Sequence, residues 1–171
     1  MSEVVVNPYS FPVPASETCY SLTGSEARIT SLSQLIGLSV SAGTDIVGKD
    51  ITEVSFYLRK NGTPTGTVYV RAWDSSSDIP ASPVVTFGSF DASTLSGSST
   101  KETFTLSSGS YTVLAGSQIG LDWGAGSHSG DIYMEGDFTD NTYGQWFVDS
   151  YTQAYELISS GAACPRYCYY G

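Results

Sequence analysis

Hydrophobic and polar residues alternate along several short segments of this chain, which is the pattern of β-strands that bury one face. In residues 51–60, Val54, Phe56 and Leu58 fall on one face, and mostly polar residues lie between them. A helix would instead repeat its apolar positions every three or four residues. The segment is therefore predicted to be a half-buried strand.

A turn and a second strand follow this segment. Residues 61–66 contain Asn-Gly and a proline, which favour the backbone angles of turns. In residues 67–73, positions 68, 70 and 72 carry apolar side chains, and Tyr69, Arg71 and Trp73 fall on the opposite face. The spacing predicts that the two strands pair as an antiparallel hairpin, with these last three side chains turned outward.

Further strands of this kind are separated by loops rich in serine, glycine and aspartate. They are predicted at residues 35–40, 84–87, 102–106, 118–123, 131–135 and 145–149. Eight or nine short strands in one domain predict an all-β fold, an antiparallel two-sheet β-sandwich. A jelly-roll type is favoured, and an immunoglobulin-like Greek key is the second choice.

Both ends of the chain differ from its middle. Residues 1–23 are proline-rich and are predicted to be an extended N-terminal arm, whose backbone needs a partner strand from its own sandwich or a neighbour's. Residues 24–158 form the predicted sandwich domain. Residues 159–171 are an aromatic, cysteine-containing tail, which we expect to pack against the sandwich or an adjacent subunit. The expected assembly contacts are Val4, Val5, Val6, Tyr9, Phe11, Tyr167, Tyr169 and Tyr170.

The charge of the chain argues against several functions. It has 17 acidic and 7 basic residues among 171, for a net charge of -10. Nucleic-acid binding is disfavoured because phosphates require concentrated lysine and arginine. The single histidine, His128, lies in a loop without a nucleophile motif, which disfavours most hydrolytic sites. No segment approaches the about 18 apolar residues of a membrane span.

Composition and the first residues bear on location. Only 14% of residues are charged and 13% are aromatic, which is typical of exposed β-structure outside the cell. The residues after Met1 have neither the basic nor the apolar region of a secretory signal. Virion proteins reach such a setting by cytoplasmic synthesis and lysis. The predicted location is therefore a virion or another extracellular surface.

Three cysteines, Cys19, Cys164 and Cys168, lie near the two ends of the chain. They allow one intrachain disulfide with a leftover thiol, an interchain bridge in an oligomer, or free thiols. The pair Cys164 and Cys168 has no further ligand beside it, and tetrahedral zinc requires four. Zinc binding is therefore not predicted.

Residues 51–74 resemble a widespread noncatalytic, jelly-roll-like β-sandwich module, found in secreted or surface-anchored prokaryotic proteins and in structural proteins of phages and archaeal viruses. The likeness continues through Asp78–Pro80, Asp91–Leu95 and Tyr111–Asp122, and it covers roughly residues 36–147. The family has no catalytic motif to transfer. The resemblance implies a non-enzymatic structural subunit, such as a capsid decoration, tail or surface-lattice protein, with copies of itself or other structural subunits as partners.

A second function class is carbohydrate binding or adhesion. Aromatic faces on a polar sheet suit the C–H surfaces of sugars. The candidate stacking residues are Tyr69, Trp73, Trp123 and Trp146. The alternative for Trp123 and Trp146 is a place in the core or in an interface.

Calcium is the one cofactor for which the sequence offers ligands. Asp131, Asp137 and Asp140 lie on or beside a predicted strand and loop, and calcium takes six to eight oxygen ligands. A solvated acidic face explains the same residues without an ion. Two carboxyls could also serve glycoside hydrolysis, but the sequence does not select a pair.

Overall fold

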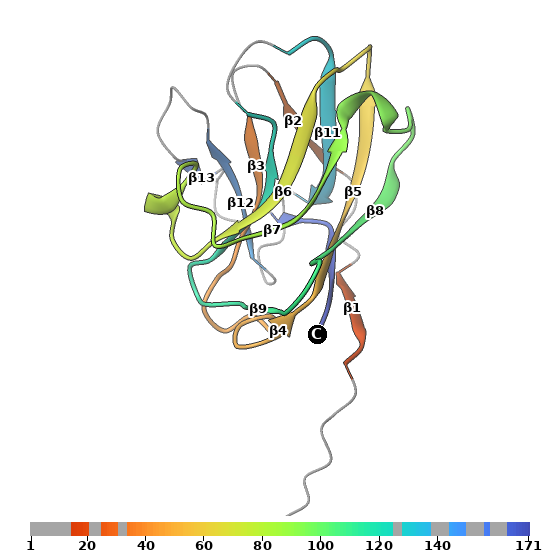
Figure 1. Cartoon of the computed structure of the whole chain (residues 1–171). Coiled ribbons are helices and arrows are strands. Elements are labelled where there is room, and N and C mark those ends of the chain that lie inside the picture. The colour runs from red at the N-terminus through yellow and green to blue at the C-terminus, as the bar shows by residue number, and fades with distance from the viewer. Residues whose placement is uncertain are drawn as a thin grey trace, which may run out of the picture.

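Two antiparallel sheets carry most of the chain, as the computed structural model shows (Figure 1). The structure describes residues 15–20, 25–30, 34–124, 128–137, 144–149, 156–157 and 164–171. Regular structure in these ranges consists of strands and two 3-10 turns, η1 (Ser76–Asp78) and η2 (Ala92–Thr94). Within the same ranges, no helix is long and apolar enough to cross a membrane.

The larger sheet, sheet A, is built around its longest strand, β5. One edge of β5 pairs with β8, and its other edge pairs with β15 and then with β11. Beyond these, β1 pairs with β15 and β2 pairs with β11, while β14 adds to the end of β11. The strands of sheet A are β1 (Glu17–Tyr20), β2 (Ser25–Ile29), β5 (Glu53–Asn61), β8 (Thr100–Thr105), β11 (Asp131–Asp137), β14 (Cys164–Pro165) and β15 (Tyr167–Tyr170).

The second sheet, sheet B, has the strand order β13-β12-β3-β10-β6-β7. A separate small ladder joins β4 to β9. The strands of sheet B are β3 (Leu35–Ser39), β6 (Thr67–Trp73), β7 (Val85–Asp91), β10 (Gln118–Asp122), β12 (Gln145–Asp149) and β13 (Glu156–Leu157), and the small ladder consists of β4 (Asp50–Ile51) and β9 (Tyr111–Thr112).

All eight predicted strands are present, and the all-β class is confirmed. The predicted hairpin is wrong, because β5 lies in sheet A and β6 lies in sheet B. The intervening turn carries the chain from one sheet to the other. Alternation cannot distinguish these cases, since two strands facing one core from opposite sides show the same pattern as two paired strands.

The two chain ends are built into sheet A. Residues 159–171 were expected to pack against the sandwich or an adjacent subunit, and the described part, residues 164–171, contributes β14 and β15 to the sheet itself. Part of the expected N-terminal arm, Glu17–Tyr20, is strand β1 of the same sheet. The arm was expected to need a partner strand, and β1 finds one in β15 of its own chain. The described ends of the chain are therefore sheet strands.

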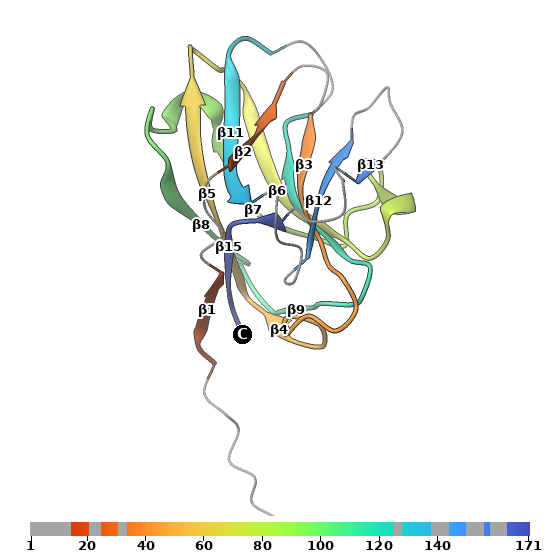
Figure 2. The ribbon, with the colours of Figure 1, turned by 180° about the vertical axis from the view of Figure 1, so that it is seen from behind.

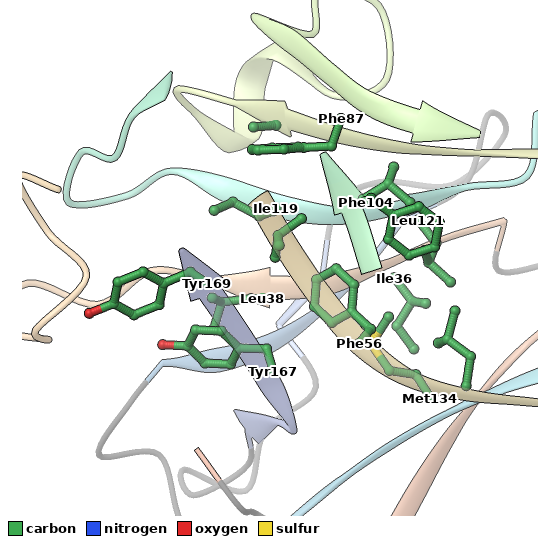
Figure 3. Close-up of a cluster of buried hydrophobic side chains, with 14 of the residues drawn as sticks. Ile36, Leu38, Phe56, Phe87, Phe104, Ile119, Leu121, Met134, Tyr167 and Tyr169 are labelled. Atoms are coloured by element: carbon green, nitrogen blue, oxygen red, sulfur yellow. The ribbon is translucent and has the colours of Figure 1, made fainter. Parts of the chain in front are cut away.

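The core lies between the inner faces of the two sheets (Figure 3). Phe56 from β5 and Met134 from β11 approach it from sheet A, and Leu38 and Ile119 approach it from sheet B. Positions 54, 56 and 58 of β5 and positions 68, 70 and 72 of β6 are fully buried, as the alternation predicted. Removal of this apolar surface from water is the main force holding the sheets together.

A glycine pair lies at the centre of sheet B. Gly37 of β3 faces Gly120 of β10, and a Cβ atom on Gly37 would lie 2.3 Å from the carbonyl oxygen of Ile119. A Cβ atom on Gly120 would lie equally close, 2.3 Å, to the carbonyl oxygen of Ile36. The two strands can therefore approach this closely only because neither position carries a side chain.

The same glycines leave room on the outer face of sheet B. Trp73 of β6 and Phe147 of β12 are separated by two strands, a lateral distance of about 14 Å. Their rings nevertheless meet at 6.4 Å in an edge-to-face contact. With Leu35 they form a second buried cluster, on the face opposite the main core.

One disulfide joins the first and last described strands. Cys19 of β1 and Cys168 of β15 are opposite residues in the ladder, and they are separated by 149 positions in sequence. Cys164 is buried and takes no part in this disulfide. Of the three arrangements open from the sequence, the structure therefore has the intrachain bridge with one leftover cysteine.

We expect Gly37→Ala to lower the free energy of unfolding by at least about 2 kcal/mol, because the new methyl group meets backbone that cannot move aside. Gly97→Ala is the matched control, since a Cβ atom there meets nothing within 4 Å. Urea unfolding of both variants checks this. Equal stabilities of the two variants would contradict the close approach of β3 and β10.

We expect the double variant Cys19→Ala/Cys168→Ala to lose up to about 5 kcal/mol of stability, because the bridge closes a loop of 149 residues in the unfolded chain. Urea unfolding with and without reductant measures the loss. Reductant should destabilise the wild-type protein and leave the double variant unchanged. A double variant as stable as the oxidised wild-type protein would rule out this contribution.

Candidate functional site

The outer face of sheet A carries a shallow depression. It has a volume of about 350 Å³ and is lined by Ser25, Glu26, Ser99 and Glu135, the residues that define the Glu26–Glu135 depression. These residues come from β2, from the turn before β8, and from β11. Every lining side chain carries a hydroxyl or a carboxylate, so the depression suits a polar ligand.

The two carboxylates of the depression are direct neighbours. Glu26 and Glu135 are opposite residues on paired strands, a placement in which like charges repel. Arg59 offsets the first charge, with Nε donating to Oε1 of Glu26 at 2.6 Å and Nη2 donating to Oε2 at 2.5 Å. Arg166 offsets the second, with Nη1 donating to Oε2 of Glu135 at 3.1 Å. The group as a whole is therefore close to neutral.

The arginine contact also sets the ionisation of Glu26. The hydrogen bonds from Arg59 hold the pKa of Glu26 below its usual value of 4.5, and those same bonds raise the pKa of Arg59. Glu26 therefore stays ionised and accepts hydrogen bonds. Glycoside hydrolysis by two carboxyls requires one with a raised pKa as proton donor, and Glu26 does not fit that role.

Aromatic rings hold both arginines in place. The guanidinium of Arg59 lies 4.0 Å from the ring centre of Tyr133, and that of Arg166 lies 3.5 Å from the ring centre of Tyr57. Such cation–π contacts limit the motion of a long side chain. In addition, Ser99 Oγ donates to Oε2 of Glu135 at 3.0 Å. The depression is thus a preformed set of acceptors and hydroxyls.

A second charged pair lies on the outer face of sheet B. Asp122 is fully buried and forms an ion pair with Arg71, while the backbone N–H of Gly124 donates to its Oδ1 at 2.9 Å. The guanidinium of Arg71 also lies 4.3 Å from the ring centre of Tyr69. Burial of a carboxylate requires such compensation, so this pair has a structural role.

The predicted sugar-stacking residues do not form one platform. Trp73 was expected to face solvent, but it is fully buried against Phe147, because the outer face of sheet B has its own apolar cluster. Trp123 is also buried, and its Nε1 donates to the carbonyl of Thr65 at 3.2 Å. Neither indole ring is open to a sugar.

The other two stacking candidates have different surroundings. Tyr69 is 37% exposed, with one face of its ring against Arg71. Trp146 belongs to β12, and its side chain falls outside the described part of the chain.

The single histidine, His128, stacks on Trp123 at 4.3 Å between ring centres. It does not line the Glu26–Glu135 depression.

The predicted calcium ligands are not brought together. Asp131 begins β11 and Asp137 ends it, so their backbones lie about 20 Å apart and cannot share an ion. Asp131 lies instead 3.9 Å from Arg28. Asp140 lies outside the described residues. Another group with ligand atoms, Glu17 with the two bridged cysteines, is unsuited because those sulfurs are bonded to each other.

The predicted assembly residues divide into three groups. Tyr167 and Tyr169 are buried in the core of their own sandwich, so their aromatic surface is not offered to a neighbour. Burial also raises the pKa of Tyr167. Tyr170 is 40% exposed. The remaining five, Val4, Val5, Val6, Tyr9 and Phe11, lie outside the described residues.

Sequence reasoning missed the depression because its parts are far apart along the chain. Glu26, Arg59, Ser99 and Glu135 belong to four separate segments and form no motif. The one available signal was the outward position of Arg59 on its strand. Comparison with protein-family models, with curated proteins and with solved structures gives no match. Function is therefore inferred from this chain alone.

We expect Glu26→Gln to lower stability by about 0.5–1 kcal/mol near neutral pH, the usual range for a partly exposed ion pair. Because folding lowers the pKa of Glu26 from 4.5, the stabilisation is present above that pH and is lost as the pH falls through the lower folded value. The difference from wild type should therefore shrink in acid, as measured by urea unfolding across this range.

Arg59→Gln is the companion variant, since it removes the same pair from the other side and should show the same pH dependence. A stability difference that stays constant into strong acid in both variants would contradict the assignment.

Proposed function

We propose that this chain is a non-enzymatic structural subunit of a virion or another extracellular assembly, such as a capsid decoration, tail or surface-lattice protein. Its partners are further copies of itself or other structural subunits. The observation that carries the proposal is the disulfide between β1 and β15. Residues 1–14 precede β1, so a load on this segment would pass through the bridge into sheet A.

The bridge also supports an extracellular location. Disulfides form and persist in oxidising surroundings and are rare in the reducing cytosol. Cys19 is exposed and therefore accessible to reductants, while Cys168 is buried. A virion or cell-surface protein meets this condition.

We further propose that the sandwich is of the jelly-roll type. Four antiparallel pairs support this, because they nest in chain order as β2 with β11, β3 with β10, β5 with β8, and β6 with β7. One long hairpin rolled into two sheets has this nesting. Jelly rolls occur both in viral capsid proteins and in lectins.

The alternative function, carbohydrate binding, is favoured by the Glu26–Glu135 depression. Its carboxylate oxygens accept hydrogen bonds, and its serine hydroxyls both donate and accept them. Sugar hydroxyls match this set, and the paired arginines leave little net charge to attract an ion. The exposed ring of Tyr69 lies on the other sheet and would form a separate contact.

The structural proposal predicts that self-association depends on residues 1–14. A chain comprising residues 15–171 keeps β1 and the disulfide, so it should fold as the full chain does. We expect light scattering to give masses above 18.2 kDa for the full chain, rising with concentration, and a monomer mass for the shortened chain.

Equal masses for the two chains at every concentration would contradict the proposal. A monomeric full chain that binds immobilised glycans, and loses this binding in Glu135→Gln, would favour the alternative function. Near-ultraviolet circular dichroism of both chains serves as the control for an unchanged fold.

A further inference from the structure

We propose that residues 4–6 of one copy add as a β-strand to the free edge of β1 in a second copy. This inference rests on the proposed function and specifies how its subunits join. Figure 2 shows β1 beside β15 at the rim of sheet A. Two features support the pairing, the unpaired edge of β1 and the proline-rich sequence that precedes it.

The edge of β1 offers unused backbone groups. Just before β1, Ser16 exchanges backbone hydrogen bonds with Gly171, the residue after β15. In an antiparallel ladder every second residue of a strand points its backbone groups toward the same neighbouring strand. Thr18 and Tyr20 therefore bond toward β15, while the N–H and C=O groups of Glu17 and Cys19 face away from it. Among the described residues, no strand pairs with this side of β1.

The side chains along this edge offer apolar surface beside one charged pair. Cys19 is exposed, although its disulfide partner Cys168 is buried, and Tyr170, opposite Glu17 in the ladder, is 40% exposed. Glu17 itself contacts Lys101. A strand that bonds to Glu17 and Cys19 places alternate side chains on this same face. Two valines from residues 4–6 would cover Cys19 and the tyrosine ring.

The disulfide prepares the edge for binding. An unbridged strand of four residues at a sheet rim would fray, and a ligand would then have to order it. The covalent bond to β15 keeps β1 extended in the absence of a partner. The exposed backbone groups of β1 are therefore already aligned when an added strand arrives.

The sequence before β1 favours a second copy over the chain's own edge. Pro12 and Pro14 favour extended backbone at their own positions and at the residues before them, so this sequence disfavours a reversal just before Ala15. Nine residues of extended chain at about 3.1 Å each would let Val6 reach about 28 Å from Ala15. A turn at Asn7-Pro8 would instead place the valines beside residues 9–11 and not beside β1.

Charge also permits this contact between copies. The chain has a net charge of -10, so copies repel one another at long range. Residues 1–14 contain one charged side chain, Glu3, and are otherwise uncharged. A contact made by this segment therefore adds little to the repulsion.

The test uses the chain 15–171 and a fluorescent peptide of residues 1–14, with binding followed by anisotropy. We expect saturable binding. Val5→Pro/Val6→Pro in the peptide removes an N–H donor in either register and should weaken binding at least about tenfold, the equivalent of one lost hydrogen bond. Val5→Thr/Val6→Thr keeps both donors and the β-branched shape and loses only part of the apolar contact, so this peptide should bind more tightly than the proline peptide.

Two variants of Glu17 test the edge itself. Glu17→Pro and Glu17→Gln both lose the carboxylate that contacts Lys101, and only the proline loses the outward N–H. We expect Glu17→Pro to weaken peptide binding at least about tenfold and Glu17→Gln to leave it nearly unchanged. Mass spectrometry of the intact disulfide confirms that both variants fold.

Equal binding by the two Glu17 variants would overturn the inference. If the full chain self-associates but the peptide does not bind, the inference fails and the proposed function stands. If the peptide binds but the full chain stays monomeric at all concentrations, residues 4–6 pair within their own chain. That result overturns both the exchange between copies and the proposed assembly.

Discussion

Strand β15 holds the two ends of the chain in one sheet, because it pairs with β5 on one side and with β1 on the other. Its inner side chains, Tyr167 and Tyr169, fill part of the main core, and its outer Cys168 forms the disulfide. Loss of this strand would expose part of the core and, at the same time, remove the only described strand to which β1 is paired and bridged. The pairing and bridging of β1, on which the proposed assembly rests, therefore depend on this one strand.

Most of the basic side chains are held in ion pairs, and several of these pairs lie on sheet A. Five of the seven basic residues pair with carboxylates among the described residues, and three of these pairs involve arginines around the outer face of sheet A. The excess negative charge therefore resides on carboxylates without a basic partner. Close contact between copies is easiest where charge is scarce, and residues 1–14 contain a single charged side chain, Glu3.

Local alternation predicted the strands well and their neighbours poorly. The inner face of β5 was correct, because alternate apolar residues require one buried side whatever the partner is. The hairpin to β6 was wrong, since pairing within a sheet and crossing between sheets have the same local pattern. Trp73 was misjudged because glycines in two other strands make room for it. The aromatic residues 167–170 were taken for a tail because an isolated short strand carries no marker of its place in a sheet.

The amino-acid sequence by itself determined the all-β class, the positions of eight strands and the inner faces of β5 and β6, because these properties depend on residues only one or two positions apart. Tertiary structure alone decided which strands pair, which cysteines join, and that Glu26, Glu135, Arg59 and Arg166 meet in one depression. Those contacts bring together residues as many as 149 positions apart. They are selected by how all the strands pack at once, which no local window of sequence contains.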